Sequence, residues 1–317
     1  MLDSKFLNAM NISLDLALEA REIIRGETGQ EIPGVRVDKD TYDHATVTTV
    51  HIEDQNAQTI MGKPVGKYIT IEAPVIKENN QQAHREVAEI LAEQLKNLIN
   101  LPMELNVLVI GLGNWNATPD ALGPKVVDQC LVTRHLYNYA PQELQGGMRP
   151  VSALAPGVLG TTGIETAEIV RGVVEKTRPS LIIAIDSLAA RSVDRIATTI
   201  QVADTGINPG SGIGNKRAGI NQETMGVRVI AIGVPTVTHA AIIAQDAIEK
   251  YINSTGGQPG DASSAIKNVL EPFGSNLTVT PKEIDILIED TAQIIAGAIN
   301  MAMHPGISPE DYGYYLH

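Results

Sequence analysis

Near the middle of the chain lies Leu105-Asn-Val-Leu-Val-Ile110, a short and nearly continuous apolar run that leads into the glycine pair Gly111-Leu-Gly113. Two later stretches have the same character, Ser180-Leu-Ile-Ile-Ala-Ile185 and Val227-Arg-Val-Ile-Ala-Ile-Gly-Val234. Runs of this kind are typical of parallel strands that are buried on both faces. Helical patterns alternate with them, over residues 122–131, 162–176 and 238–252. The sequence therefore predicts an α/β fold with a mostly parallel central sheet flanked by helices.

The stretches on either side of this region predict two further features. Residues 45–52 and 66–74 are rich in β-branched side chains, and the second alternates apolar and polar positions, so we expect a small antiparallel β subregion near residues 45–74. A final helix is predicted to start at Thr280-Pro281, with the threonine as N-cap, and to run to Met303. No repeat of fixed period is present, and we expect a single domain.

Composition excludes several classes of protein. The chain has 317 residues, with 24 Lys and Arg against 37 Asp and Glu, a net charge of −13 that disfavours direct contact with nucleic acid. Its one cysteine, Cys130, excludes an internal disulfide. No apolar run reaches the roughly 18 residues of a membrane span, and the acidic first 25 residues do not resemble a signal peptide. We expect a soluble chain of a reducing compartment with no membrane partner.

Two aspartates are the main candidates for chemistry. Ligands and catalytic groups of an open parallel sheet lie beyond the carboxyl ends of its strands. Asp186 directly follows one apolar run, and Asp120 lies in the loop that follows another. If the two strands are neighbours, the carboxylates face one crevice, where the pair can hold one proton, take a proton from water and give one to a leaving amine. The alternative is structural: Asp120 caps a helix, and Asp186 pairs with Arg191.

Other motifs carry weaker signals. The pair Gly111-Leu-Gly113 lacks the third glycine of a dinucleotide motif, and the glycine-rich stretch 210–217 lacks the Gly-Lys-Ser/Thr ending of a phosphate loop, so both are interpreted as turns. His239 follows the third apolar run and is a possible third member of the site. With the two aspartates it forms a ligand set for a divalent metal, which is the alternative to a metal-free pair. We expect no cofactor and no metal.

Several blocks of the sequence resemble one known family. Asn114-Trp-Asn-Ala-Thr-Pro-Asp120-Ala-Leu-Gly-Pro124 resembles the signature of the germination protease family of endospore-forming bacteria. The resemblance extends over nearly the whole chain, through residues 155–157, 162–166, 184–192, 204–217, 232–236 and 279–285. It implies an atypical aspartic-type endopeptidase that degrades small acid-soluble spore proteins during germination, with Asp120 and Asp186 as its essential aspartates. It also implies a fold like that of the hydrogenase maturation proteases, which keeps the metal-dependent alternative open.

The resemblance further implies a self-processing precursor. Members of this family remove their own N-terminal segment at a site that resembles the substrate motif acidic–apolar–Ala–x–Glu, and Asp15-Leu-Ala-Leu-Glu19 matches it here. We therefore expect cleavage between Asp15 and Leu16, residues 1–15 as the propeptide and residues 16–317 as one peptidase domain. A homotetramer in the forespore cytoplasm is also implied. Possible residues of the substrate groove are Gly163, Glu165, Lys216 and Arg217. A non-catalytic peptide- or nucleotide-binding module is the remaining alternative.

Overall fold

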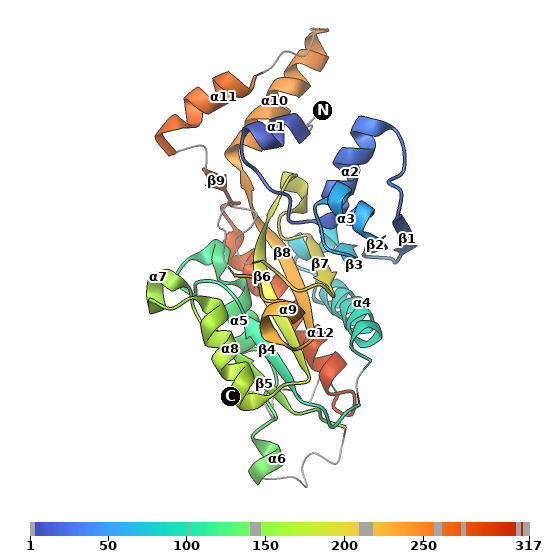
Figure 1. Cartoon of the computed structure of the whole chain (residues 1–317), viewed down its shortest axis with the longest axis vertical. Helices are drawn as coiled ribbons and strands as arrows, with labels where there is room; N and C mark the ends of the chain where they lie inside the picture. The colour runs from blue at the N-terminus through green and yellow to red at the C-terminus, as the bar shows by residue number, and fades with distance from the viewer. Residues whose placement is uncertain are drawn as a thin grey trace.

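The structure is a computed structural model, and it describes residues 4–100, 102–139, 147–208, 218–256, 262–273, 277–308 and 312. Helices flank a single sheet of nine strands in this part of the chain, so the fold is mixed α/β (Figure 1). The strands follow the order β1-β2-β3-β7-β8-β6-β4-β5, and β9 pairs with β8. Their bounds are β1 Val35–Thr41, β2 Thr46–Ile52, β3 Gly66–Glu72, β4 Val107–Gly111, β5 Val151–Leu154, β6 Leu181–Ala190, β7 Thr199–Ala203, β8 Val229–His239 and β9 Thr278–Val279.

The helices lie around this sheet and beyond one end of it. Those that pack on the sheet or connect its strands are α4 Gln81–Ile99, α5 Leu122–Asp128, α7 Leu159–Thr162, α8 Thr166–Thr177, α9 Gln222–Met225 and α12 Ile284–Met303. Those of the N-terminal part are α1 Ser4–Ala9, α2 Ala17–Thr28 and α3 Gln55–Met61. The others are α6 Leu136–Tyr139, α10 Ala240–Thr255 and α11 Ser263–Leu270.

The three apolar runs form the parallel strands that the sequence predicts. They are β4, β6 and β8, which pair in parallel, and β5 lies outside β4 in the same direction. Every residue of β4 is buried, as are nearly all residues of β6 and β8. Strands that run parallel in one sheet need a long crossover, and α8 supplies it between β5 and β6, which lie on either side of β4.

The prediction that the whole sheet is mostly parallel is wrong. The strands β1, β2, β3, β7 and β8 pair antiparallel in that order, and so do β8 and β9. The reason lies in the short connection between Ala190 and Thr199, which does not carry the chain back to the start of β6. The next strand, β7, therefore runs antiparallel to β8 and joins the antiparallel strands near residues 45–74 to the parallel ones. Those strands belong to the same sheet as the parallel part.

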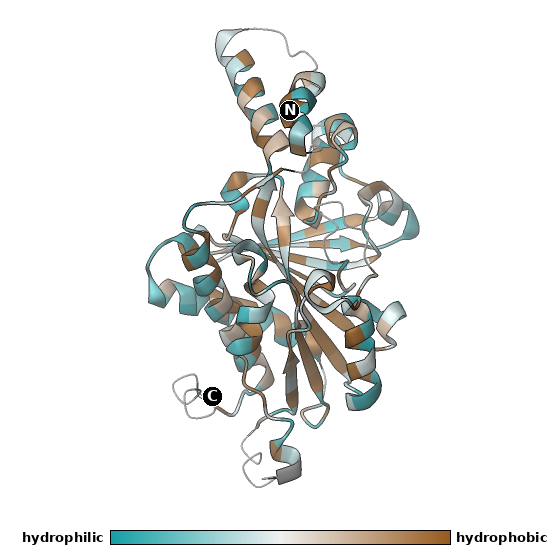
Figure 2. Ribbon diagram, turned by 90° about the vertical axis from the view of Figure 1, so that its left-hand side faces the viewer, coloured by the Kyte–Doolittle hydropathy of each residue, from teal (hydrophilic) through white to brown (hydrophobic). Residues whose placement is uncertain are grey.

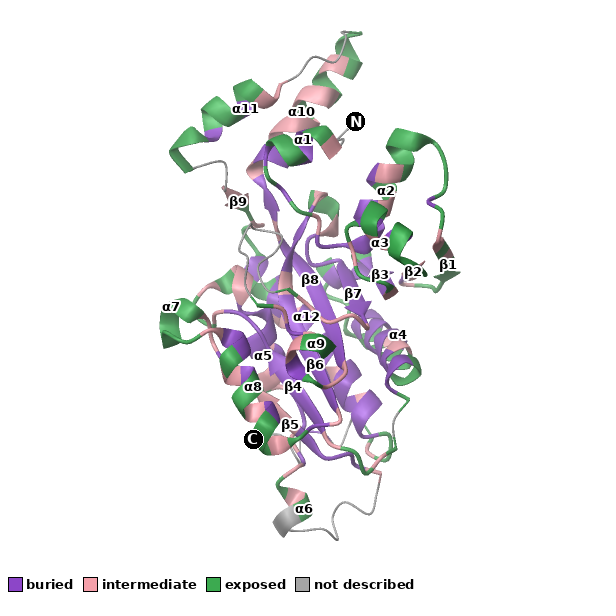
Figure 3. Ribbon diagram, in the orientation of Figure 1, coloured by how far each residue is buried: buried purple, intermediate pink, exposed green. Residues whose placement is uncertain are grey.

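Two apolar clusters cover the two faces of the parallel strands. On one face, Val109, Ile183 and Ile232 pack with residues of α4, α5 and α12. On the other face, Leu108 and Ile182 pack with Val170 of α8 and Met225 of α9. The buried strands and the exposed outer sides of the helices are clear in Figure 3, and the apolar centre of the sheet in Figure 2. Alternate residues of each strand therefore point to opposite faces, which fixes where each candidate side chain points.

The longest helix, α12, belongs to this core. Within the described residues it is long and apolar enough to cross a membrane by length and composition alone, but 67 % of its apolar window is buried inside the protein. It packs along α4, as Figure 1 shows. Its composition is that of a core helix of a globular fold.

Candidate active site

Asp120 is placed by a turn that only glycine permits. After β4, Gly113 has φ +117°, and a Cβ atom at this residue would overlap the carbonyl oxygen of Asp120. The chain therefore folds back on itself, and the backbone N–H of Asn114 donates to the Oδ2 atom of Asp120 at 2.9 Å. Gly111 has a similar role, because a Cβ atom there would overlap the backbone of Gly123 in α5. The glycine pair thus serves close packing of α5 and Asp120 on the strand end.

Asp186 lies at the same edge of the sheet. Gly111, the last residue of β4, pairs with Ile185 of β6, so Asp186 is the first residue of β6 beyond the end of β4. The backbone N–H of Leu112 donates to the carbonyl oxygen of Ile185 at 2.8 Å. Asp186 is buried, with 5 % of its surface exposed, and its Oδ1 atom accepts from the backbone N–H of Ser187. Asp120 and Asp186 therefore both lie against the short turn that follows β4.

His239 occupies a different place. It ends β8 six residues beyond Gly233, the residue that pairs with Asp186, which is about 20 Å along an extended strand. There it is buried and pairs with Thr278 of β9. Among the residues that the structure describes, no group of three or more His, Cys, Asp or Glu side chains is arranged to hold a metal ion. The structure thus brings the two aspartates to one edge and leaves His239 at the far end of β8.

The predicted cleavage site is held inside the fold. Leu16 is completely buried, and the carboxylate of Asp15 accepts from the backbone N–H of Ala189 at 2.9 Å. The carbonyl oxygen of Asp15 belongs to the bond between these two residues, and it accepts from Lys63 Nζ at 2.9 Å and from Gln201 Nε2 at 3.2 Å. The peptide bond Asp15–Leu16 is therefore held from both sides by polar contacts.

The sheet register relates this bond to Asp186. Gln201 of β7 pairs with Gly233 of β8, which pairs in turn with Asp186 of β6. Residues paired in this way point to the same face, so Gln201 and Asp186 lie in one row on one face, two strand spacings or about 10 Å apart at Cα. Gly233 lies between them and has no side chain of its own, and the side chain of Leu188 packs over it. A cavity of about 100 Å³ opens here, lined among others by Asp15, Lys63, Gln201 and Gly233.

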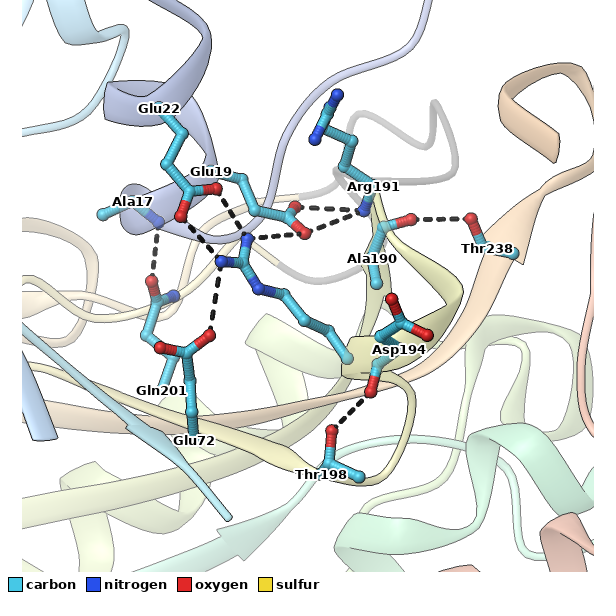
Figure 4. Close-up of polar contacts among 11 residues, drawn as sticks. Ala17, Glu19, Glu22, Glu72, Ala190, Arg191, Asp194, Thr198, Gln201 and Thr238 are labelled. Atoms are coloured by element: carbon cyan, nitrogen blue, oxygen red, sulfur yellow. Dashed lines mark hydrogen bonds and ion pairs between the residues drawn. The ribbon is translucent and has the colours of Figure 1, made fainter. Parts of the chain in front are cut away.

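A second group of contacts holds Glu19, the last residue of the predicted cleavage motif. Its side chain is completely buried, and both carboxylate oxygens accept from the backbone N–H of Arg191 at 3.0 Å (Figure 4). The guanidinium of Arg195 lies 3.2 Å away and also pairs with Glu22 and Glu72, at 2.8 and 3.3 Å. Burial raises the pKa of Glu19 to about 6, although Arg195 and the hydrogen bond from Arg191 act to lower it.

The raised pKa makes a prediction about folding stability. Because the unfolded value is 4.5, the folded chain binds the Glu19 proton more tightly between pH 4.5 and about 6. The contribution of this group to the free energy of unfolding is complete below pH 4.5 and falls by about 2 kcal/mol as the pH rises through 6. Urea unfolding at pH 4.5 and 7 is expected to show this loss in the wild type and not in Glu19→Gln. An equal pH dependence in both proteins would contradict the assignment.

The candidate groove residues fall into two sets. Gly163 ends α7 and Glu165 precedes α8, so both lie in the connection that follows β5, at the same edge of the sheet as the two aspartates. Lys216 and Arg217 lie outside the described residues. Asn208 and Asn221, which precede and follow Lys216 and Arg217 in the sequence, line the same cavity as Asp15 and Gln201.

Sequence reasoning did not find Lys63, Gln201 or Arg195. Lys63 lies in the turn-rich segment before β3, and Gln201 is one polar residue in a short strand that the sequence did not reveal. No spacing relates them to Asp186, because only the sheet register places them near it. Arg195 lies nearest to a sequence signal, since it is three residues beyond the family-like block 184–192.

The arrangement defines a class of protein: a mixed α/β fold with two aspartates at one edge of the sheet. A buried peptide bond of the same chain contacts Gln201, which lies in the same row of the sheet as Asp186. A comparison with family models extends this result, because the germination protease model matches residues 13–259 and 254–316. The chain belongs to the germination protease family, as the sequence predicts, and is a protease.

Individual relatives agree with this assignment. The germination protease of Caldanaerobacter subterraneus subsp. tengcongensis is 47 % identical over 323 residues, which cover 97 % of this chain and 99 % of the relative. That of Clostridium perfringens (strain ATCC 13124) is 44 % identical, covering 96 % and 99 %. That of Bacillus velezensis is 40 % identical, covering 98 % of each chain. The similarity therefore extends over the whole described fold.

Proposed function

We propose that this chain is an endopeptidase that starts the degradation of small acid-soluble spore proteins during germination, and that it is made as a precursor that cuts itself between Asp15 and Leu16. The observation that carries the proposal is the location of that bond. The carbonyl oxygen of the bond accepts from Gln201, which lies in the same row of the sheet as Asp186. The carboxylate of Asp15, just before the bond, is bound by the backbone N–H of Ala189. Membership of a protease family supports the same activity.

Asp120 and Asp186 are the proposed catalytic pair. In this proposal the two carboxylates share one proton, as two carboxylates at close range do when both cannot ionise freely. The ionised member takes a proton from water as the water attacks the peptide carbonyl, and the protonated member gives one to the leaving amine. Burial of Asp186 favours this role, because electrostatic interactions between charged groups are stronger away from bulk water.

The N-terminal segment is the proposed propeptide. In the precursor, residues 1–15 precede a bond that is buried together with Leu16 and Glu19, so the chain's own segment occupies the place of a substrate. The stretch has the spacing acidic–apolar–Ala–x–acidic, and both acids are bound by backbone N–H groups. A spore protein with the same spacing would be bound through the same groups. A homotetramer and a forespore location remain expectations from the family resemblance, as does a likeness to the hydrogenase maturation proteases.

The test uses the purified full chain and a small acid-soluble spore protein. Mass spectrometry of the products is expected to show cuts directly after the first acid of the motif, at the same rate with and without a metal chelator. A substrate in which that acid is changed to its amide is the matched control and is expected to be cut at least about 10-fold more slowly, since it loses a charged hydrogen bond. Cuts that disregard the motif would contradict the proposed specificity, and cutting that the chelator abolishes would favour the metal-dependent alternative.

A further inference from the structure

Hydrolysis of a peptide bond needs more than a water-activating pair. When water adds to the carbonyl carbon, the carbonyl oxygen acquires a negative charge, and preorganised donors directed at it are often the largest single contribution to catalysis. Neither aspartate supplies such a donor in its ionised form, because a carboxylate only accepts. The remaining requirement is therefore a set of N–H groups at the oxygen of the bond that is cut.

The structure has two donors at that oxygen. The ammonium of Lys63 lies 2.9 Å from the carbonyl oxygen of Asp15, and the amide nitrogen of Gln201 lies 3.2 Å from it. The two residues belong to different elements that are far apart in the sequence: Lys63 lies just before β3, and Gln201 lies within β7. We propose that Lys63 and Gln201 are catalytic residues that bind the carbonyl oxygen of the scissile bond and stabilise its charge in the transition state. This inference rests on the proposed cleavage between Asp15 and Leu16.

The contacts of Gln201 fix the orientation of its amide. Its Oε1 atom accepts from the backbone N–H of Ala17 at 2.7 Å, and an N–H group donates only to an acceptor (Figure 4). The Nε2 atom is therefore the one that faces the carbonyl oxygen of Asp15. One side chain thus contacts the chain on both sides of the scissile bond, which aligns that bond along β7.

Lys63 donates to the same oxygen and in its protonated form brings a positive charge to it. It is half-buried, and burial lowers its pKa, while the charges of Asp15 and Glu19 act in the opposite direction. A cation at reduced solvent exposure stabilises a developing oxyanion more strongly than it stabilises the neutral carbonyl. Its contact is made to a backbone carbonyl, so it is available for any substrate whose main chain takes the place of residues 15–17.

The complete step balances without any further reactant. Water forms a bond to the carbonyl carbon of Asp15, its proton passes to the ionised member of the aspartate pair, and the π electrons of the carbonyl move to the oxygen beside Lys63 and Gln201. When the carbonyl re-forms, the bond to the nitrogen of Leu16 breaks, and this nitrogen takes a proton from the pair. The products are a carboxyl group at Asp15 and an amine at Leu16.

The test compares the rate of self-cleavage in variants of the full chain. Lys63→Met removes the charge at similar length, and Gln201→Glu keeps the acceptor for Ala17 but removes the donor to Asp15. Each is expected to slow the loss of residues 1–15, followed by intact-mass spectrometry, by about 10²- to 10³-fold. Lys63→Arg retains a donor and a charge and is expected to recover part of the rate. Lys39→Met, on the exposed strand β1, is the matched control and is expected to cleave as the wild type does.

A purely structural role gives a different result. If Lys63 and Gln201 only tether the N-terminal segment, their loss loosens that segment into α2, so hydrogen exchange at residues 18–22 increases and cleavage is unchanged or faster. The catalytic role predicts slow cleavage with exchange at residues 18–22 close to that of the wild type, because Glu19 is still bound by Arg191 and Arg195. Cleavage at the wild-type rate in both variants would overturn the inference, whereas a wild-type chain that does not cut itself would overturn the proposed function.

Discussion

The variant Asp186→Asn is expected to lose the cutting of spore-protein substrates by about 10⁴-fold, the upper range for removal of a general acid–base group. An asparagine has almost the same shape as an aspartate, but it neither takes a proton from water nor gives one to the leaving amine. Its amide oxygen still accepts from the N–H of Ser187, so the local backbone is retained. The measurement is the initial rate of substrate cleavage, followed by mass spectrometry of the products.

Asp120→Asn is expected to have an effect of the same order. Here too the amide oxygen is able to accept from the N–H of Asn114, so the turn after β4 is kept while the carboxylate is lost. Asp285→Asn, at the exposed start of α12, is the control and should cut at the wild-type rate. If Asp186→Asn alone is inactive, Asp120 has only the structural role of holding the turn. Full activity in Asp186→Asn would exclude the pair altogether.

The second large effect is expected from Arg195→Met. Arg195 is 13 % exposed and forms ion pairs with three carboxylates, those of Glu19, Glu22 and Glu72, and these contacts raise its pKa despite its burial. Removing one partner of a buried ion pair leaves an uncompensated charge at Glu19 and costs about 3–5 kcal/mol in the free energy of unfolding. The expected result is a large fall in the midpoint of urea unfolding at pH 7, with the largest increase in hydrogen exchange over α2.

A double variant separates the charge from the packing. In Glu19→Gln/Arg195→Met no buried carboxylate is left at residue 19, so the double variant is expected to be more stable than Arg195→Met alone at pH 7. The difference between them should disappear well below pH 4.5, where Glu19 is protonated in the folded and in the unfolded chain. If Arg195→Met unfolds at the wild-type urea concentration, the ion pairs of Arg195 with Glu19 and Glu22 do not stabilise the packing of α2 on the sheet.

Local sequence patterns predict the parallel half of the fold for a physical reason. Strands that are buried on both faces must be apolar at nearly every position, and this signal is present in β4, β6 and β8. Once those strands are identified, the edge where β4 ends follows from the rule for parallel sheets. The same rule predicts Asp120 and Asp186 as candidates, because the sequence places Asp186 directly after one apolar run and Asp120 in the loop after another.

The rest depends on pairings that no local pattern contains. The short strand β7 carries no local signal for its partners, yet it joins the antiparallel strands to β8 and places Gln201 in the row of Asp186. The start of α12 shows the same limit on a smaller scale. The helix begins at Ile284 and not at Pro281, and the hydroxyl of Thr280 instead donates to the carbonyl oxygen of Thr236, a contact with a distant strand.

The central claim is that the two aspartates cut the bond between Asp15 and Leu16, and intact-mass spectrometry of the full chain tests it most directly. Wild type, Asp120→Asn and Asp186→Asn would be incubated side by side in the presence of a metal chelator. The account predicts a product that begins at Leu16 in the wild type and the uncut chain in both variants. A product that begins at Leu16 in Asp186→Asn, or a wild-type chain cut at another bond, would contradict it.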